Sequence, residues 1–315
     1  MNQGVSRDLI HRFERNPIIE LENLSFTCLN IMNAGAVKLG DQYILLIRIE
    51  TMKGHSVFVV ARSTNGTSFT LDKEPIMVPA TKGEFRKYEE HGVADPRITY
   101  LDETFYIVYT AMSRNGKRLA LAKTSDFKTI ERVSLISQPD NHNGALFPRK
   151  INDLYVRLER PFEGGNIWIA YSKDLLHWGA ASVLMSPRGP GFWDASRVGC
   201  AVPPIEVEEG WLLIYYGVKE TSAGPLFRLG AAILDKKNPS KILGRTETPI
   251  LSPREYYERV GDYGNMIFSC GAIVDDGELK LYYGGADMGI NLGTAPLSDL
   301  VDVCLKKETS SNGAV

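Results

Sequence analysis

Cysteine is scarce in this chain, and the sequence patterns that mark several common functions are absent. The four cysteines, Cys28, Cys200, Cys270 and Cys304, lie far apart, and none belongs to a CxxC pair. We therefore expect reduced, mostly buried thiols and no metal site, because structural zinc needs clustered ligands. The chain also lacks the GxGxxG, GxxxxGK[ST] and HExxH motifs, so we expect no cofactor.

Long apolar runs and an excess of one charge are absent as well. No apolar run approaches the roughly 18 residues that span a bilayer, and MNQGVSRDLIHRFERNP lacks the apolar segment of a secretory signal. The net charge of −2 gives no reason to expect nucleic acid or an anionic membrane as a partner. We expect a cytoplasmic protein without these partners. The sequence leaves the oligomeric state open, a homo-oligomer included.

The chain has little helical periodicity, but it has an internal repeat. Five units follow one another at intervals of roughly 50 to 70 residues, within the range typical of propellers. Each unit has a short apolar strand, a turn with Gly, Asp or Asn, an aromatic-rich strand and a third strand. Residues 34–50 (AGAVKLGDQYILLIRIE) and 95–113 (DPRITYLDETFYIVYTAMS) are examples.

This pattern predicts an all-β fold, and the repetition favours a β-propeller over a β-sandwich, because each sheet can bury both faces against its neighbours. We expect residues 1–315 to form one five-bladed β-propeller, a single catalytic domain. Residues 6–17 form a short N-terminal extension that could be a helix, with Ile10 and Phe13 on one face and Pro17 at its end. Residues 306–315 are expected to be a frayed tail.

Polar residues recur at equivalent places in the repeats, and in a propeller such places converge at one end of the central channel. A lone charge in an apolar strand costs several kcal/mol unless it is paired. We therefore interpret these residues as a pocket for a polyol and an anion, with salt bridges between blades as the alternative. The first ring holds Asn33, Asp95 with Arg97, Asn143 and the Asp194–Arg197 segment, and the second holds Arg48 with Glu50, Tyr109, Arg160, Tyr216 and Asp287.

Other candidate residues are judged by their local sequence. Asp95 taken alone could be only a turn residue before Pro96. Trp193, in a Gly- and Pro-rich loop, is a candidate for stacking on a sugar, whereas the remaining tryptophans lie in strands and are expected in the core. His142 precedes a strand on the pocket side, and His177 is expected to be structural.

At these residues the chain resembles glycoside hydrolase family 130, the β-mannoside phosphorylases and related β-mannosidases. The resemblance runs over roughly residues 16–300 and rests on specific motifs. These are MNAGAVK (32–38), LLIRIE (45–50), GVADPRIT (92–99), NGALFPRK (143–150), LERP (158–161), RVGCAVPPI (197–205), GWLLIYYGV (210–218) and YYGGAD (282–287).

The resemblance implies a five-bladed propeller with Asp95 as general acid and with Asn33, Arg48 and Asp287 holding the reacting mannosyl unit. Arg97, Tyr109 and Asp194 are further candidates for substrate binding. The positions that bind phosphate in the family correspond here to His142, Asn143, Arg160, Arg197 and Tyr216. This sequence departs from the family pattern at three places: His142 stands where Arg is usual, Tyr216 where His is usual and Phe227 where Tyr is usual.

The expected activity is inverting phosphorolysis of a β-linked manno-oligosaccharide. We expect the linkage to be β-1,2. Inorganic phosphate is the co-substrate and α-mannose 1-phosphate the product. Phosphate needs no general base but needs cations, to which a protonated His142 could contribute. The alternative is an inverting β-1,2-mannosidase, in which Glu50, Glu159 or Glu258 would activate water. A third alternative is a non-catalytic sugar-binding propeller.

Overall fold

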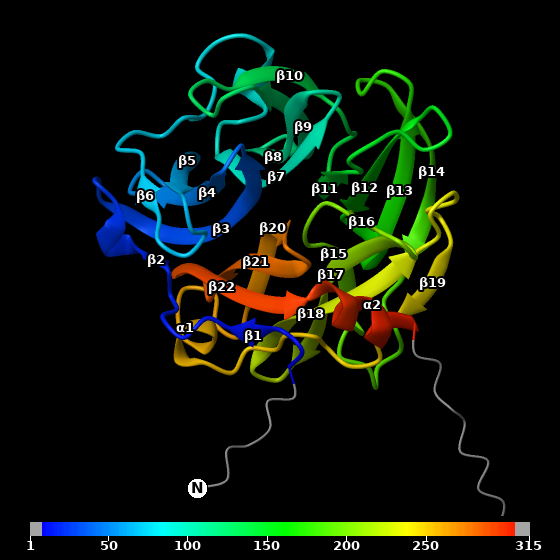
Figure 1. The fold of residues 1–315 in the computed structure, drawn as a ribbon. Helices are drawn as coiled ribbons and strands as arrows, with labels where there is room; N and C mark the ends of the chain where they lie inside the picture. Colours follow the sequence, from blue (N-terminus) through cyan, green and yellow to red (C-terminus); the bar gives the residue numbers. More distant parts are fainter. Residues whose placement is uncertain (1–7, 306–315) are drawn as a thin grey trace, which may run out of the picture.

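The computed structural model of the chain describes residues 8–305, whose regular secondary structure is mainly antiparallel β-strand (Figure 1). These residues form four sheets, with two short helices, α1 (Tyr256–Arg259) and α2 (Leu297–Leu305). The predicted all-β class is therefore confirmed. In this part of the chain, no helix has the length and apolar character that crossing a membrane would require.

The largest sheet has eight strands and divides into two antiparallel runs. A single parallel residue pair, Ser56 with Gly92, joins the runs. The first run contains β3 (Cys28–Leu39), β4 (Gln42–Thr51), β5 (Ser56–Ser63) and β6 (Thr70–Leu71). The second run contains β7 (Gly92–Leu101), β8 (Thr104–Ser113), β9 (Gly116–Thr124) and β10 (Glu131–Leu135).

The other three sheets follow in chain order. One contains β11 (Asn141–Leu146), β12 (Tyr155–Pro161), β13 (Ile167–Ser172) and β14 (Trp178–Met185). The next contains β15 (Arg197–Cys200), β16 (Ile205–Val207), β17 (Gly210–Thr221), β18 (Gly224–Leu234) and β19 (Ile242–Arg245). The last contains β20 (Ile267–Asp275), β21 (Glu278–Gly285) and β22 (Gly289–Pro296), with β1 (His11–Arg12) and β2 (Ile19–Glu20) paired to β22.

The second strand of a run buries both of its faces, which explains its continuous apolar sequence. Successive side chains of a strand point to opposite faces. In β4, Ile44 and Leu46 belong to the hydrophobic cluster shared with the second run, whereas Leu45 and Ile47 belong to the cluster shared with the last sheet. Similar clusters fill the spaces between the other neighbouring sheets. Burial on both faces is thus the main source of stability for these strands.

The first strands of successive runs pack closely against one another at the centre of the molecule. Strand β3 contacts both β7 and β20. This approach needs glycine, because a Cβ on Gly35 would lie 2.6 Å from the Pro96 carbonyl oxygen, and one on Gly271 would lie 2.2 Å from the Ala36 nitrogen. Residues near the ends of these strands are therefore brought together although they are far apart in the sequence.

The prediction of an N-terminal helix over residues 6–17 is wrong for the part of this segment that the structure describes. His11 and Arg12 form β1, which pairs with Thr294 and Gly293 of β22. The exposed edge of β22 offers unpaired backbone groups, and satisfying them outweighs a weak local preference for helix. The predicted tail, residues 306–315, lies outside the described residues.

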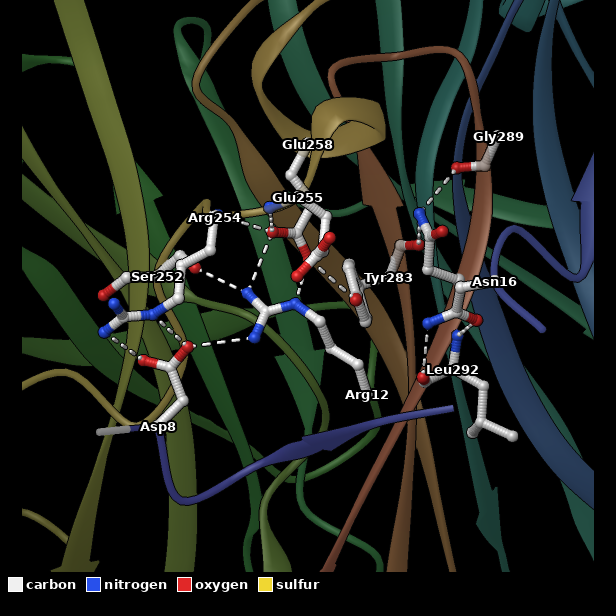
Figure 2. Close-up of polar contacts among 11 residues, drawn as sticks. Asp8, Arg12, Asn16, Ser252, Arg254, Glu255, Glu258, Tyr283, Gly289 and Leu292 are labelled. Carbon is white, nitrogen blue, oxygen red and sulfur yellow. Dashed lines mark hydrogen bonds and ion pairs between the residues drawn. The ribbon is translucent and has the colours of Figure 1, made fainter. Parts of the chain in front are cut away.

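Side-chain contacts also hold the N-terminal segment against the last sheet (Figure 2). Arg12 donates to Glu258 Oε1 (2.8 Å) and to Asp8 Oδ2 (3.0 Å). Glu258 is completely buried and also accepts a hydrogen bond from the Tyr283 hydroxyl (2.9 Å). The Asn16 side chain donates to the Leu292 carbonyl oxygen and accepts from its N–H, both at 2.8 Å.

Candidate active site

Four of the central strands are interrupted by a β-bulge at a similar position. A bulge adds residues to one strand and re-aims a side chain, and bulges are common beside active sites. The register shifts lie between Ile31 and Asn33 in β3, Ala94 and Arg97 in β7, His142 and Ala145 in β11, and Ser269 and Gly271 in β20. Two of the bulge residues, Asp95 (φ 53°) and Asn143 (φ 54°), have left-handed backbone conformations, which asparagine and aspartate tolerate better than most residues.

The bulged strands open onto a pocket of about 810 Å³. Nine of the twelve predicted site residues line it: Asn33, Arg48, Asp95, His142, Asn143, Arg160, Arg197, Tyr216 and Asp287. Seven separate strands and one hairpin turn contribute these side chains. The pocket therefore brings together residues that the sequence separates by more than 250 positions.

Asp95 is held as a carboxylate on one side of the pocket. Its Oδ1 accepts hydrogen bonds from Asn33 Nδ2 and Arg48 Nη1, both at 2.9 Å. Burial alone would raise the pKa of Asp95, but the charges of Arg48 and Arg97 and the two hydrogen bonds outweigh burial, so its pKa is lowered. Asp95 is therefore ionised at neutral pH when the pocket holds no substrate.

Asp287 is the second acidic residue in the pocket lining, and its environment shifts its pKa in the opposite direction to that of Asp95. It lies in the turn between β21 and β22, with a left-handed φ of 59° and 7% exposure. Burial raises the pKa of Asp287 to about 7; Arg48 opposes the rise, and the nearby carboxylate of Asp95 adds to it. At neutral pH, Asp287 is thus close to half protonated while Asp95 is charged.

The other side of the pocket is positively charged. Arg160 contacts His142 Nε2, so this nitrogen accepts and the ring is neutral. Burial, with the charges of Arg160 and Lys117, lowers the pKa of His142 to about 3. In the free pocket His142 is therefore neutral, mainly because it is buried, whereas the sequence suggested a protonated ring. Positive charge comes instead from Arg160, Arg197 and Lys117, all of which line the pocket.

Two neutral polar groups lie among these cations. Asn143 Nδ2 donates to the Tyr216 hydroxyl oxygen. Burial raises the pKa of Tyr216, although Arg160 and other nearby cations oppose the rise, so its hydroxyl keeps a proton that it can donate. Phe227 packs on Tyr216, with ring centroids 5.9 Å apart, and the Arg197 guanidinium lies over Phe227 at 5.3 Å.

Arg97, Tyr109 and Asp194, the other residues predicted to bind substrate, do not line the pocket. Arg97 lies behind Asp95 and donates to the carbonyl oxygens of Cys200 (2.8 Å), Ala201 (2.9 Å) and Asp95 itself (3.1 Å). It therefore holds the β7 bulge in place.

Tyr109 and Asp194 belong to buried networks elsewhere. The Tyr109 hydroxyl donates to Glu89 (2.7 Å), which also binds Arg132. Asp194 accepts from Arg188 (2.8 Å), Arg245 (2.6 Å) and Tyr215 (3.0 Å) and is completely buried. Each of these side chains has its hydrogen-bonding capacity used by neighbours, so none is available to a ligand.

The carboxylates considered as bases for water activation also lie outside the pocket lining. Glu50 accepts a hydrogen bond from Asn30 (3.2 Å), and Glu258 lies in the N-terminal network of Figure 2. Glu159 forms a buried ion pair with Arg157 on the face of its sheet that is turned away from the pocket.

Trp193, expected to stack on a sugar, is instead 8% exposed in a hydrophobic cluster, where it stacks on Tyr215. Trp211 is buried in the core as expected, whereas Trp168 and Trp178 are half-buried. His177 is exposed and pairs with Asp174 three residues earlier, which fits a structural role. All four cysteines are unpaired, and three are buried.

Sequence reasoning missed Lys117 and the apolar wall of the pocket. Lys117 follows the tight turn between β8 and β9, a place where lysine is usually only a solvated charge, and no motif marks it. The wall includes Phe162, Tyr263, Met266 and Phe268. Within residues 8–305, no cluster of His, Cys, Asp and Glu has the arrangement of a metal site.

Comparison with known proteins identifies the family of the chain. A family model described as beta-1,4-mannooligosaccharide phosphorylase matches residues 8–306. The chain belongs to glycoside hydrolase family 130. A relative named beta-1,2-mannobiose phosphorylase, from Listeria innocua, is 41% identical over 232 residues, which cover 72% of this chain and 63% of that protein. The aligned part therefore spans less than two thirds of that relative.

In two further matches, the alignment covers a larger share of the matched protein. A 1,2-beta-oligomannan phosphorylase from a Thermoanaerobacter species is 36% identical, with 76% of this chain and 78% of that protein aligned. The solved structure of the Listeria innocua beta-1,2-mannobiose phosphorylase in complex with beta-1,2-mannobiose superimposes with a TM-score of 0.86. At 30% identity, that alignment covers 94% of this chain and 99% of the solved one.

Proposed function

We propose that the chain is an inverting β-mannoside phosphorylase that cleaves a β-1,2-linked manno-oligosaccharide with inorganic phosphate and releases α-mannose 1-phosphate. The names of the two relatives, a beta-1,2-mannobiose phosphorylase and a 1,2-beta-oligomannan phosphorylase, support this linkage. One observation carries the choice of phosphate over water. Besides Arg48, which pairs with Asp95, three cations line the pocket (Lys117, Arg160 and Arg197), and the three glutamates considered as bases lie outside its lining.

The positive side of the pocket suits an inorganic phosphate dianion. Arg160 and Arg197 both act on Tyr216, and Arg160 and Lys117 both act on His142, so the three charges lie around one place. Guanidinium groups bind phosphate oxygens with two parallel N–H bonds. Asn143 and the protonated Tyr216 hydroxyl add neutral donors. In this role Tyr216 supplies the hydrogen bond that the usual histidine provides in the family.

The opposite side suits the mannosyl unit and the leaving group. Asn33, Arg48 and Asp287 surround Asp95 and offer donors and acceptors to sugar hydroxyls. Inverting cleavage needs a proton for the leaving oxygen and a nucleophile on the opposite face of the sugar. Phosphate among the cations would be that nucleophile, and Asp95 would give the proton directly or through a sugar hydroxyl.

Asp95 must first gain a proton, because it is ionised in the free pocket. A phosphate dianion bound in the same pocket places a second negative charge near Asp95, and a like charge raises the pKa of a carboxyl group. A sugar hydroxyl that takes up the hydrogen bonds of Arg48 and Asn33 would raise it further. Binding of both substrates would therefore prepare the acid.

We also propose that the four sheets are five blades of one propeller in a single catalytic domain over residues 1–315. The count is supported by the division of the eight-stranded sheet into two runs and by the agreement of each run with one sequence repeat. The unpaired cysteines support a cytoplasmic location.

Product analysis with β-1,2-mannobiose tests the proposed activity. With phosphate, we expect equal amounts of mannose and α-mannose 1-phosphate, and without phosphate we expect no cleavage. Arg160→Ala should raise the KM for phosphate at least about tenfold, because it removes a charge-assisted hydrogen bond. Free mannose released at the same rate with and without phosphate would overturn the proposal.

A hydrolase remains the second candidate because of Asp287. Its pKa of about 7 is near the value of an efficient general base, and it lines the same pocket as Asp95. A hydrolase would release two mannose molecules per mannobiose without phosphate, and Arg160→Ala would leave that rate unchanged. Asp287→Asn would abolish it.

A further inference from the structure

A second cavity, of about 520 Å³, lies between the second run of the large sheet and the sheet of β11–β14. It shares no lining residue with the candidate active site. Strands β11 and β12 separate the two cavities. His142 and Arg160, which are paired across these strands, line the first cavity, and their neighbours Asn141 and Pro161, also paired, line the second.

The cavity lies where the hydrophobic core is thinnest. The cluster between the second run and the β11–β14 sheet contains only seven buried residues, the fewest among the five clusters of the described chain. Beside apolar residues such as Leu135 and Leu176, the gap is lined by polar or amphipathic side chains, among them Arg118, Arg157, Glu159, Trp168 and Trp178. This gap is therefore not closed by apolar packing as the other interfaces are.

Unsatisfied polar atoms mark the second cavity as they mark the first. Within the described residues, eight buried side-chain nitrogen or oxygen atoms have no hydrogen-bond partner. Three belong to His142, Asn143 and Arg160 of the candidate active site, and three belong to Asn141, Arg157 and Trp168 of the second cavity. An unsatisfied buried polar group costs about 1–3 kcal/mol, so such groups gather where a ligand or water completes the bonding.

The chemistry of the lining favours a neutral polyol with an apolar face. Arg157 is 2% exposed, pairs with Glu159 and lies 4.3 Å over the Trp178 ring, so its charge is already balanced. The Glu159 carboxylate in the wall opposes an anion. Amide, carboxylate and indole groups offer both donors and acceptors, which match hydroxyls, and the indole rings match the C–H face of a sugar ring.

We propose that this second cavity binds a β-mannoside sugar unit outside the catalytic pocket. The volume lies within the range of small-molecule sites. The choice of a mannoside rests on the proposed function, whereas the choice of a carbohydrate rests on the two half-buried tryptophans, the paired Arg157 and Glu159, and the unsatisfied polar atoms of the lining. A sugar held here is separated from the phosphate side of the first pocket by β11 and β12 alone.

Tryptophan fluorescence tests the proposal selectively. The chain has four tryptophans; Trp168 and Trp178 line the second cavity, none lines the first, and Trp193 and Trp211 are buried in the core. Titration of the full chain with β-1,2-mannobiose in phosphate-free buffer should give a saturable change in emission. The same change should persist in Arg48→Ala, which weakens sugar binding in the first pocket.

Filling the second cavity should remove the signal. Ala181 is an exposed residue of its lining, so Ala181→Phe adds bulk to the cavity and not to the core. The matched control is Ala223→Phe, at an exposed turn between β17 and β18 that lines neither cavity. We expect the emission change to be lost in Ala181→Phe and kept in Ala223→Phe.

Three results would overturn the proposal: no emission change with mannobiose, a change that persists in Ala181→Phe, or an equal change with inorganic phosphate alone, which would indicate an anion site. These results are independent of turnover. A chain that fails to cleave mannobiose with phosphate, but shows the emission change and its loss in Ala181→Phe, would refute the proposed activity and leave the second site intact.

Discussion

Asp287 should make the folded protein less stable at pH 8 than at pH 5, and Asp287→Asn should remove that contribution. The folded state raises the pKa of this carboxyl group from 3.8 to about 7. Between these values the folded chain binds more protons than the unfolded chain, so the stabilising effect of the proton is present at low pH and is lost as the pH rises through about 7.

The gap between 3.8 and about 7, at about 1.4 kcal/mol for each pH unit, gives a difference of about 4 kcal/mol at pH 8. Asparagine is close in shape to protonated aspartate and tolerates the left-handed φ of 59°. We therefore expect Asp287→Asn to exceed the wild type in free energy of unfolding by about 1.6 kcal/mol at pH 5 and by about 4 kcal/mol at pH 8, because the unfolded carboxyl group is already ionised at pH 5.

Urea unfolding in phosphate-free buffer at both pH values measures this difference. Asp276→Asn is the matched control, because Asp276 also lies in a hairpin turn of the last sheet with a left-handed φ of 49°, but it is exposed and lies outside the pocket. Its effect on the free energy of unfolding should be the same at both pH values. If Asp287→Asn also has the same effect at pH 5 and pH 8, the raised pKa and the reasoning based on burial are wrong.

Three further predictions concern the pocket and the N-terminal network. Lys117→Ala should raise the KM for phosphate by about tenfold and leave the KM for mannobiose unchanged, and an effect on mannobiose alone would place Lys117 on the sugar side. Asp95→Asn should lower kcat by about 10²–10⁴-fold in steady-state assays, and a loss below tenfold would exclude it as the acid. Glu258→Gln should lower the free energy of unfolding by about 3–5 kcal/mol, because Arg12 would keep a buried charge without its main partner. Removing Arg12 as well should recover part of this loss, and a fully additive double variant would contradict the pairing.

The all-β class and most of the residues that line the pocket can be predicted from the sequence, because both follow from the periodicity of the repeats. Repeats of similar length place their first strands side by side, so Asn33, Asp95 and Asn143 could be grouped without any knowledge of contacts. The bulges that aim these side chains were not visible in the sequence. Tyr109 lies within the regular strand β8, and its hydroxyl binds Glu89 in the segment before β7, a contact that no local pattern encodes.

Partners far apart in the sequence explain the remaining differences. The sequence predicts Asp194 as a ligand-binding carboxylate, but Arg188 from a loop and Arg245 from the end of β19 bind it, and no local pattern encodes their approach. The N-terminal segment has helix-compatible spacing, yet its backbone pairs with a strand formed by residues 289–296. The titration of Asp95 and Asp287 in opposite directions depends on Arg48, hydrogen bonds and burial together, and residue identity alone does not determine that balance.

The pairing of β1 with β22 also has a consequence for biosynthesis. A nascent chain leaves the ribosome with His11 and Arg12 long before Gly293 and Thr294 have been made, so the last sheet cannot be completed until β22 has been synthesised. Until then the early segment has no strand to bind. A product shortened at its start would leave β22 as a bare edge, open to pairing with a second molecule.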